Sequence, residues 1–295
     1  MSSSPTGRAP FRRVAIALSA LVLLGLACAG VLWLRLPEPS LFVKQAPRTT
    51  ALIEQRRTEA AEKGRRFSPR MSWVPLDRIS PRLVQAVILS EDAKFFGHEG
   101  FDWVAIRDAA EQGIERGRFT RGASTITQQL AKNLWLGTER SLSRKAREAM
   151  LAVKLERQLP KRRILALYLN VVEWREGVFG AEAASRAWFG KSARDLSTAE
   201  AALLASMLPA PRRAALAPAP RWLARRARRC VDHLWQARKI DAAEHARARA
   251  ELEALLSGDL GGDDEDPPED APPMADAAPA TSPASAMDDA MAKVR

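Results

Sequence analysis

The residues best suited to chemistry are two adjacent carboxylates at the end of an apolar segment. Residues 91–102 read Glu-Asp-Ala-Lys-Phe-Phe-Gly-His-Glu-Gly-Phe-Asp. The preceding apolar residues have the spacing of a buried helix face that Glu91 extends; they are Leu83, Val84, Val87 and Ile88. Ser80 is the expected N-cap of this helix, before Pro81. Desolvation raises the pKa of a carboxylate, which would suit Glu91 to accept a proton near neutral pH. The alternative is a Glu at a frayed helix end in solvent.

A second segment places hydroxyl and amide side chains at the start of a helix. Residues 122–133 read Gly-Ala-Ser-Thr-Ile-Thr-Gln-Gln-Leu-Ala-Lys-Asn. We expect Ser124 to be the N-cap, with Ile126, Leu130 and Leu134 as the buried stripe. The polar residues, followed by Lys132, would suit sugar hydroxyls or phosphate oxygens. A capped polar surface helix is the alternative interpretation.

A further carboxylate, Glu148, also interrupts an apolar stripe. It shares one helix face with Ala152, Leu155 and Leu159. Arg144 and Lys145 lie one turn earlier, and pairing with them would keep Glu148 ionised and lower its pKa. Two carboxylates whose pKa values are driven apart are typical of acid–base chemistry on sugars. An ordinary intrahelical salt bridge is the alternative.

Basic residues cluster between these stretches and can neutralise a pyrophosphate leaving group. They are Lys132, Arg140, Arg144, Lys145 and Arg147. A solvated basic face, or a contact with anionic lipid, is compatible with the same cluster. The three histidines show no metal-ligand spacing, and His98 is expected to be a structural hydrogen-bonding residue. A divalent ion could still bridge a pyrophosphate through Glu91 or Asp92.

The elements that must position these residues begin with an apolar segment near the N-terminus. Residues 14–34 carry no charge, which matches the thickness of a bilayer and predicts a transmembrane helix. Arg12 and Arg13 precede it and place residues 1–13 in the cytoplasm. A cleaved signal peptide, or a lipoprotein site at Cys28, is the weaker alternative because the apolar run continues past the small residues. An exported basic domain meets lipid head groups and wall precursors, which argues against a nucleic-acid partner.

Three further regions follow from composition. Residues 35–71 resemble a juxtamembrane linker. Residues 72–257 are expected to form one helical domain. Within it, the motifs lie in 72–212, and 221–257 is expected to be a basic helix or helix pair. We expect no alternating strands and no disulfide between Cys28 and Cys230. The net charge of +11 conceals an acidic segment, since residues 259–295 carry ten acids and two bases. Residues 258–295 are rich in Pro and Ala and are predicted to be disordered.

The order of these motifs resembles the peptidoglycan glycosyltransferases, glycosyltransferase family 51. The resemblance rests on residues 91–102, 122–129, Arg-Lys-x-x-Glu at 144–148 and Tyr-Leu-Asn at 168–170, and covers about residues 72–212. It is closest to the monofunctional members, since no penicillin-binding domain follows. It implies a mainly α, lysozyme-like domain with a single N-terminal transmembrane helix, in the inner membrane and facing the periplasm. Arg175 and Trp188 depart from the family pattern, which usually has Gly and Tyr there.

The resemblance implies polymerisation of lipid II into β-1,4 glycan strands, with inversion and release of undecaprenyl pyrophosphate. Glu91 is similar to the general base, and Glu148 to the carboxylate that assists the leaving group. Phe96 and Trp103 are expected with Phe95 in a hydrophobic region near the bilayer. The implied substrate-binding residues are Asp92, Phe95, His98, Ser124, Thr125, Gln128, Gln129, Lys132, Asn133, Arg140, Arg144 and Lys145.

The expected partners are lipid II, the growing glycan strand, membrane lipids, and wall-synthesis or division proteins. No cofactor is required, although Mg²⁺ or Mn²⁺ bridged by Glu91, Asp92 and Glu148 is an open alternative. A lytic transglycosylase or lysozyme-type enzyme shares the fold but has no need of the cation cluster. A non-catalytic wall-synthesis scaffold has no need of two intact carboxylates.

Overall fold

The computed structural model describes residues 8–115, 124–139, 141–216 and 218–257. This part of the chain is mainly helical, as the sequence predicts, and its elements form two compact units that divide between Glu38 and Pro39. The elements of the second unit are η1 (Pro39–Val43), α2 (Ala51–Glu62), β1 (Arg70–Met71), η2 (Leu76–Arg78), α3 (Pro81–Glu91), η3 (Phe95–Gly97), α4 (Trp103–Glu115), α5 (Ile126–Ala131), η4 (Lys132–Leu136), α6 (Leu142–Gln158), α7 (Lys161–Val171), β2 (Glu173–Arg175), β3 (Val178–Phe179), α8 (Ala181–Phe189), η5 (Ala193–Asp195), α9 (Thr198–Met207), α10 (Arg221–Gln236) and α11 (Ala242–Leu256).

The first unit contains one long helix, α1 (Arg8–Arg35). Its segment Ile16–Arg35 has a mean hydropathy of 2.4 and is the one helix among the described residues that is long and apolar enough to cross a membrane. The helix therefore extends beyond both ends of the predicted span, 14–34. Its composition supports a membrane anchor, because about 20 apolar residues match the hydrocarbon thickness.

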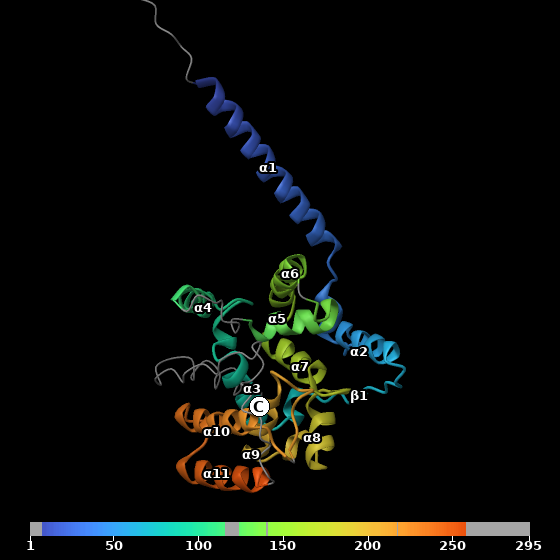
Figure 1. Ribbon diagram of the computed structural model, residues 1–295, viewed down its shortest axis with the longest axis vertical. Helices are drawn as coiled ribbons and strands as arrows, with labels where there is room; N and C mark the ends of the chain where they lie inside the picture. The colour runs from blue at the N-terminus through green and yellow to red at the C-terminus, as the bar shows by residue number, and fades with distance from the viewer. Residues whose placement is uncertain (1–7, 116–123, 140, 217, 258–295) are drawn as a thin grey trace, which may run out of the picture. The chain divides into compact units, whose positions relative to one another are not determined.

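The core of the second unit forms around α9, which is buried along its whole length. This helix packs against α3, α10 and α11 (Figure 1). Its sequence is rich in Ala and Leu on every face, which is typical of a central helix. The predicted apolar face of α3 is fully buried here, and the region 221–257 forms the helix pair α10 and α11.

Three short strands, which the sequence did not predict, form a small sheet in the order β1-β3-β2. Leu52 and Ile53 of α2 pack against Phe179 of β3. The segment 35–71 is therefore not a free linker, because α2 and β1 contribute to the folded body. Gly180, at φ 84°, ends this sheet where an added Cβ would lie 2.6 Å from the Asn170 carbonyl oxygen.

The two residues that depart from the family pattern contact each other. The Arg175 guanidinium on β2 lies over the Trp188 ring on α8, 4.8 Å from its centroid. A cation over an aromatic face is attracted by the ring quadrupole. The two departures are thus one local interaction, and neither residue belongs to the helices that carry Glu91 and Glu148.

Candidate active site

Glu91 is the last residue of α3 and is almost completely buried, with 8% of its surface exposed. Its Oε2 accepts a hydrogen bond of 3.0 Å from the Gln129 side chain, and its Oε1 accepts one of 3.3 Å from Arg226 Nη2. Burial raises the pKa of the Glu91 carboxyl, while Arg226, Gln129 and Lys132 act to lower it. The predicted direction of the shift is confirmed. Glu91 is therefore a desolvated carboxylate with one buried cation beside it.

Arg226 is a site residue that the sequence analysis missed. It comes from α10, 135 positions along the chain, and also approaches the Ser90 carbonyl oxygen at 3.4 Å. A signal was present, because Arg226 lies among the buried residues Trp222, Leu223 and Cys230 of its helix. A charged residue inside such a stripe must have a partner within the fold.

Gln129 connects Glu91 to Tyr168 on α7. The Tyr168 hydroxyl donates to Gln129 Oε1 at 3.0 Å, which leaves the Gln129 amide nitrogen directed at Glu91. Burial, followed by the charges of Glu91 and Asp92, raises the pKa of Tyr168 well above its usual value, so the phenol stays protonated. Tyr168 thus fixes the orientation of the amide that holds the carboxylate.

Glu148 lies on α6 and is 2% exposed. Its carboxylate pairs with Arg144 and Lys145, each at 2.5 Å, as the spacing predicts. Lys145 also donates to the Ser124 hydroxyl at 3.0 Å. Ala152, Leu155 and Leu159 are buried on the same face. Glu148 therefore sits in a cationic environment that its own helix supplies, one turn earlier.

Lys132 is a largely buried cation that interacts electrostatically with both carboxylates. Burial lowers the pKa of its ammonium, Glu148 and then Glu91 act to raise it, and Arg144 and Lys145 lower it further. The residue begins η4, a π-helical turn that continues α5 and ends at Gly137. Such turns change the direction of side chains within a helix and are frequent at functional sites.

Asp92 makes its hydrogen bonds within the loop after α3 and to the start of α5. Its Oδ2 accepts the Ile126 backbone N–H at 2.9 Å, and its Oδ1 lies 2.9 Å from His98 Nε2. His98 Nδ1 accepts the Gly100 N–H, and Thr125 donates to the Gly100 carbonyl. The structural interpretation of His98 is therefore confirmed. Asp92, His98 and Thr125 join the loop after α3 to the start of α5, which is a positioning role.

The helix that follows Ser124 begins one residue later than predicted. Thr125 is the N-cap: its hydroxyl accepts the Gln128 N–H, and the Gln128 side chain accepts the Thr125 N–H. This reciprocal pair is a capping box, whose Thr-x-x-Gln signature was present in the sequence. Ile126, Leu130 and Leu134 are buried, as expected. Thr125, Thr127, Gln128 and Asn133 are buried too, so this is not a polar surface helix.

The remaining predicted site residues divide into three groups. Gln128, Asn133 and Phe95 are buried, and Phe95 lies beneath the Lys161 ammonium rather than on a surface. Trp103 is 70% exposed and stacks with Phe101. Arg140 lies outside the described residues. The groups gathered around the two carboxylates are thus Ser124, Gln129, Lys132, Arg144 and Lys145, with Arg226 and Tyr168 added by the structure.

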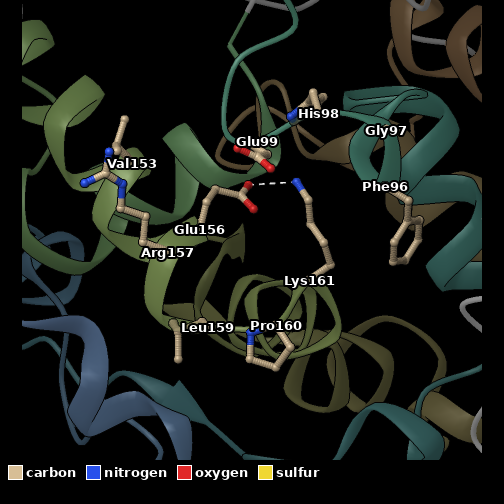
Figure 2. A pocket seen from close by; sticks show the side chains of 10 residues that line it. All are labelled: Phe96, Gly97, His98, Glu99, Val153, Glu156, Arg157, Leu159, Pro160 and Lys161. Atoms are coloured by element: carbon tan, nitrogen blue, oxygen red, sulfur yellow. Dashed lines mark hydrogen bonds and ion pairs between the residues drawn. The ribbon is translucent and has the colours of Figure 1, made fainter.

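A hollow of about 670 Å³ lies beside the loop after α3 (Figure 2). It is lined by His98 and Glu99 on one side and by Glu156, Arg157 and Lys161 on the other. Lys161 and Thr127 both donate to the Glu156 carboxylate. Neither Glu91 nor Glu148 lines this hollow, so it is distinct from the carboxylate site.

The carboxylates do not converge on a common cation position. Asp92 holds His98 and a backbone N–H, Glu91 faces Arg226, and Glu148 faces Arg144 and Lys145. No group of three or more candidate ligands occurs among the described residues. The described residues thus hold no preformed set of three protein ligands for a divalent ion, and a bridging ion stays a prediction.

Comparisons with known proteins identify the family of the chain. A family model described as Transglycosylase matches residues 58–234. Several similar proteins are named biosynthetic peptidoglycan transglycosylase. The one from Laribacter hongkongensis is 49% identical over 166 residues, covering 56% of this chain and 73% of the relative. That from Thiobacillus denitrificans is 46% identical over 184 residues, 62% and 76% of the two chains. That from Bordetella pertussis is 48% identical over 198 residues, 65% and 81%. The chain therefore belongs to the transglycosylase family, which confirms the resemblance that its motifs carry.

Proposed function

We propose that this enzyme polymerises lipid II into β-1,4-linked glycan strands, inverting the anomeric carbon and releasing undecaprenyl pyrophosphate. One observation carries the proposal. A desolvated carboxylate and a carboxylate in a cationic environment both interact electrostatically with the Lys132 ammonium. The relatives named biosynthetic peptidoglycan transglycosylase support the same substrate class.

Glu91 is proposed as the general base. Its carboxylate would accept the proton of the acceptor 4-hydroxyl while that oxygen forms a bond to the anomeric carbon of the growing strand. The acceptor would have to approach Glu91 through the small part of its surface, 8%, that is exposed. Gln129 and Arg226 hold both carboxylate oxygens, which limits rotation of the side chain. A fixed base with a raised pKa is suited to transfer near neutral pH.

The cations around Glu148 are proposed to bind the leaving pyrophosphate. As the bond between the anomeric carbon and the phosphate oxygen breaks, negative charge accumulates on the departing group. Lys132, Arg144 and Lys145 supply positive charge from one side of the site. Glu148 orients Arg144 and Lys145 through direct ion pairs. In this proposal the positive side chains neutralise the charge that develops on the leaving group, and no bridging metal ion is needed.

We propose that α1 anchors the enzyme in the inner membrane, with the N-terminus in the cytoplasm and the catalytic domain in the periplasm. Arg8, Arg12 and Arg13 at the start of the helix support this orientation. An uncleaved anchor would hold the enzyme at the surface where a lipid-linked substrate is found. Wall-synthesis and division proteins are the partners expected at that location.

The test is a polymerisation assay with lipid II in detergent, comparing the wild type with Glu91→Gln. We expect glycan strands from the wild type, none from the variant, and equal thermal melting of both. A parallel reaction supplies finished glycan, since a hydrolytic or lytic enzyme would cleave it and a polymerase would not. A chelator is added in a third arm, where we expect the rate to be retained. Polymerisation by Glu91→Gln would remove the assignment of the base.

A further inference from the structure

The acidic C-terminal segment has no role in the proposed reaction. Residues 259–276 contain eight of the ten acids that follow Gly258, while both basic residues of the segment lie at 293 and 295. The rest of the chain is strongly basic. A polyanionic segment attached to a polycationic body is attracted to it over a Debye length of about 10 Å in dilute salt. Which basic surface it meets depends on where the segment leaves the fold.

Three arginines form an exposed row on α10. Arg221, Arg225 and Arg229 are spaced by four residues and are all exposed, so they lie along one face of the helix. The neighbouring face is buried through Trp222, Arg226 and other residues. We define Arg221, Arg225 and Arg229 as the arginine row. Because Arg226 and Arg229 are close in helical angle, the row borders the side of α10 that holds Glu91.

The described part of the chain ends near the arginine row. The helices α10 and α11 are antiparallel, since Arg228 pairs with Glu253 at 2.7 Å and Asp232 contacts His245 at 2.8 Å. This register places the end of α11 beside the start of α10, where Arg221 and Arg225 lie. The described chain ends at Ser257, and the first acid is Asp259. The acidic segment therefore begins two residues after a point of the chain that lies near the arginine row.

We propose that the arginine row is the docking surface for the acidic segment 259–276 of the same chain. A short covalent connection gives the segment a millimolar effective concentration at the row. Each exposed ion pair is weak, but several charges meeting one row act together. The bound segment neutralises this face of α10 and keeps other polyanions from it. The proposal is independent of the reaction that the enzyme catalyses.

The experiment uses the chain in detergent, with or without residues 259–295. A fluorescent peptide of residues 259–276 is titrated into each protein at low salt and followed by anisotropy. We expect the peptide to bind the truncated chain and to bind the full chain at least about tenfold more weakly, because the attached segment occupies the row. A rise in salt to 0.5 M should abolish binding. A peptide with its acids replaced by amides should not bind.

The decisive variant replaces Arg221, Arg225 and Arg229 by Glu in the truncated chain. We expect the peptide affinity to fall at least about tenfold. The matched control replaces three other exposed cations, Lys63, Arg66 and Arg78, by Glu, which changes the net charge equally. Circular dichroism and thermal melting verify that both proteins fold. Equal losses in the two triple variants would show non-specific attraction and overturn the proposal. Equal peptide affinity for full and truncated chains, or binding that resists salt, would also overturn it.

Discussion

The surroundings of Glu91 and Glu148 differ in where their partners come from. Glu148 is paired with Arg144 and Lys145 of its own helix. Glu91 is held by Gln129 and Arg226, which lie 38 and 135 residues away along the chain. Burial dominates the pKa of Glu91 and raises it, whereas two cations contact Glu148. In the proposed function, one carboxylate accepts a proton and the other organises positive charge.

The largest effect is expected from removing the base. Glu91→Gln keeps the shape and the hydrogen-bonding capacity of the side chain but cannot accept a proton. We expect the polymerisation rate to fall by about 10³-fold, within the range for general-base catalysis. The matched control is Glu99→Gln, an exposed carboxylate eight residues later. A comparable loss of rate in the control would mean that both substitutions act by disturbing the loop after α3, and not by removing a base.

Glu148→Gln tests the other half of the comparison. We expect turnover to slow by about 10²-fold, because Arg144 and Lys145 lose the anion that orients them. Glu156→Gln is the control, since Glu156 is also a buried, ion-paired carboxylate on α6. The control should lose stability but keep its rate when correctly folded. A normal rate for Glu148→Gln would reduce this residue to a structural ion pair.

The charge of Arg226 leads to a prediction about the pH dependence of the polymerisation rate. Its charge lowers the pKa of Glu91, so Arg226→Gln should raise that pKa further. The base works only when ionised, and activity is lost as pH falls through its pKa. The acid limb of the pH–rate profile should therefore move to higher pH, with a loss of about tenfold at neutral pH. Arg226→Lys should restore most of the profile. An unshifted acid limb in Arg226→Gln would show that Arg226 supports only the fold.

The smallest effect is expected from Tyr168→Phe. This change removes the hydrogen bond to Gln129, which is worth about 1 kcal/mol, and leaves both carboxylates and their cations in place. We expect a loss of less than about tenfold in kcat/KM with the acid limb at nearly the same pH. Steady-state kinetics across the pH range measure both quantities. A loss as large as that of Glu91→Gln would assign the phenol a direct part in the reaction.

Much of the site was predictable because it is local. The apolar spacing of α3 and α6 indicates which face of each helix is buried, and hence that Glu91 and Glu148 interrupt those faces. The capping box at Thr125 was also readable, although Ser124 was chosen instead. The short strands escaped prediction because pairings of two or three residues have no measurable periodicity. The π-helical turn at Lys132 has no sequence pattern that we recognise.

The amino-acid sequence by itself determined the local pairs, such as Arg144 and Lys145 with Glu148, because residues three and four apart on a helix are neighbours in any fold. It also determined that residues 14–34 are apolar enough to span a membrane and that residues 259–295 are acidic. Only the tertiary structure decided that α10 packs on α3 and brings Arg226 to Glu91. It also decided that Asp92 and His98 contact one another. The reason is that side-chain spacing encodes the face of a helix, whereas the partner of that face is chosen by the packing of distant segments.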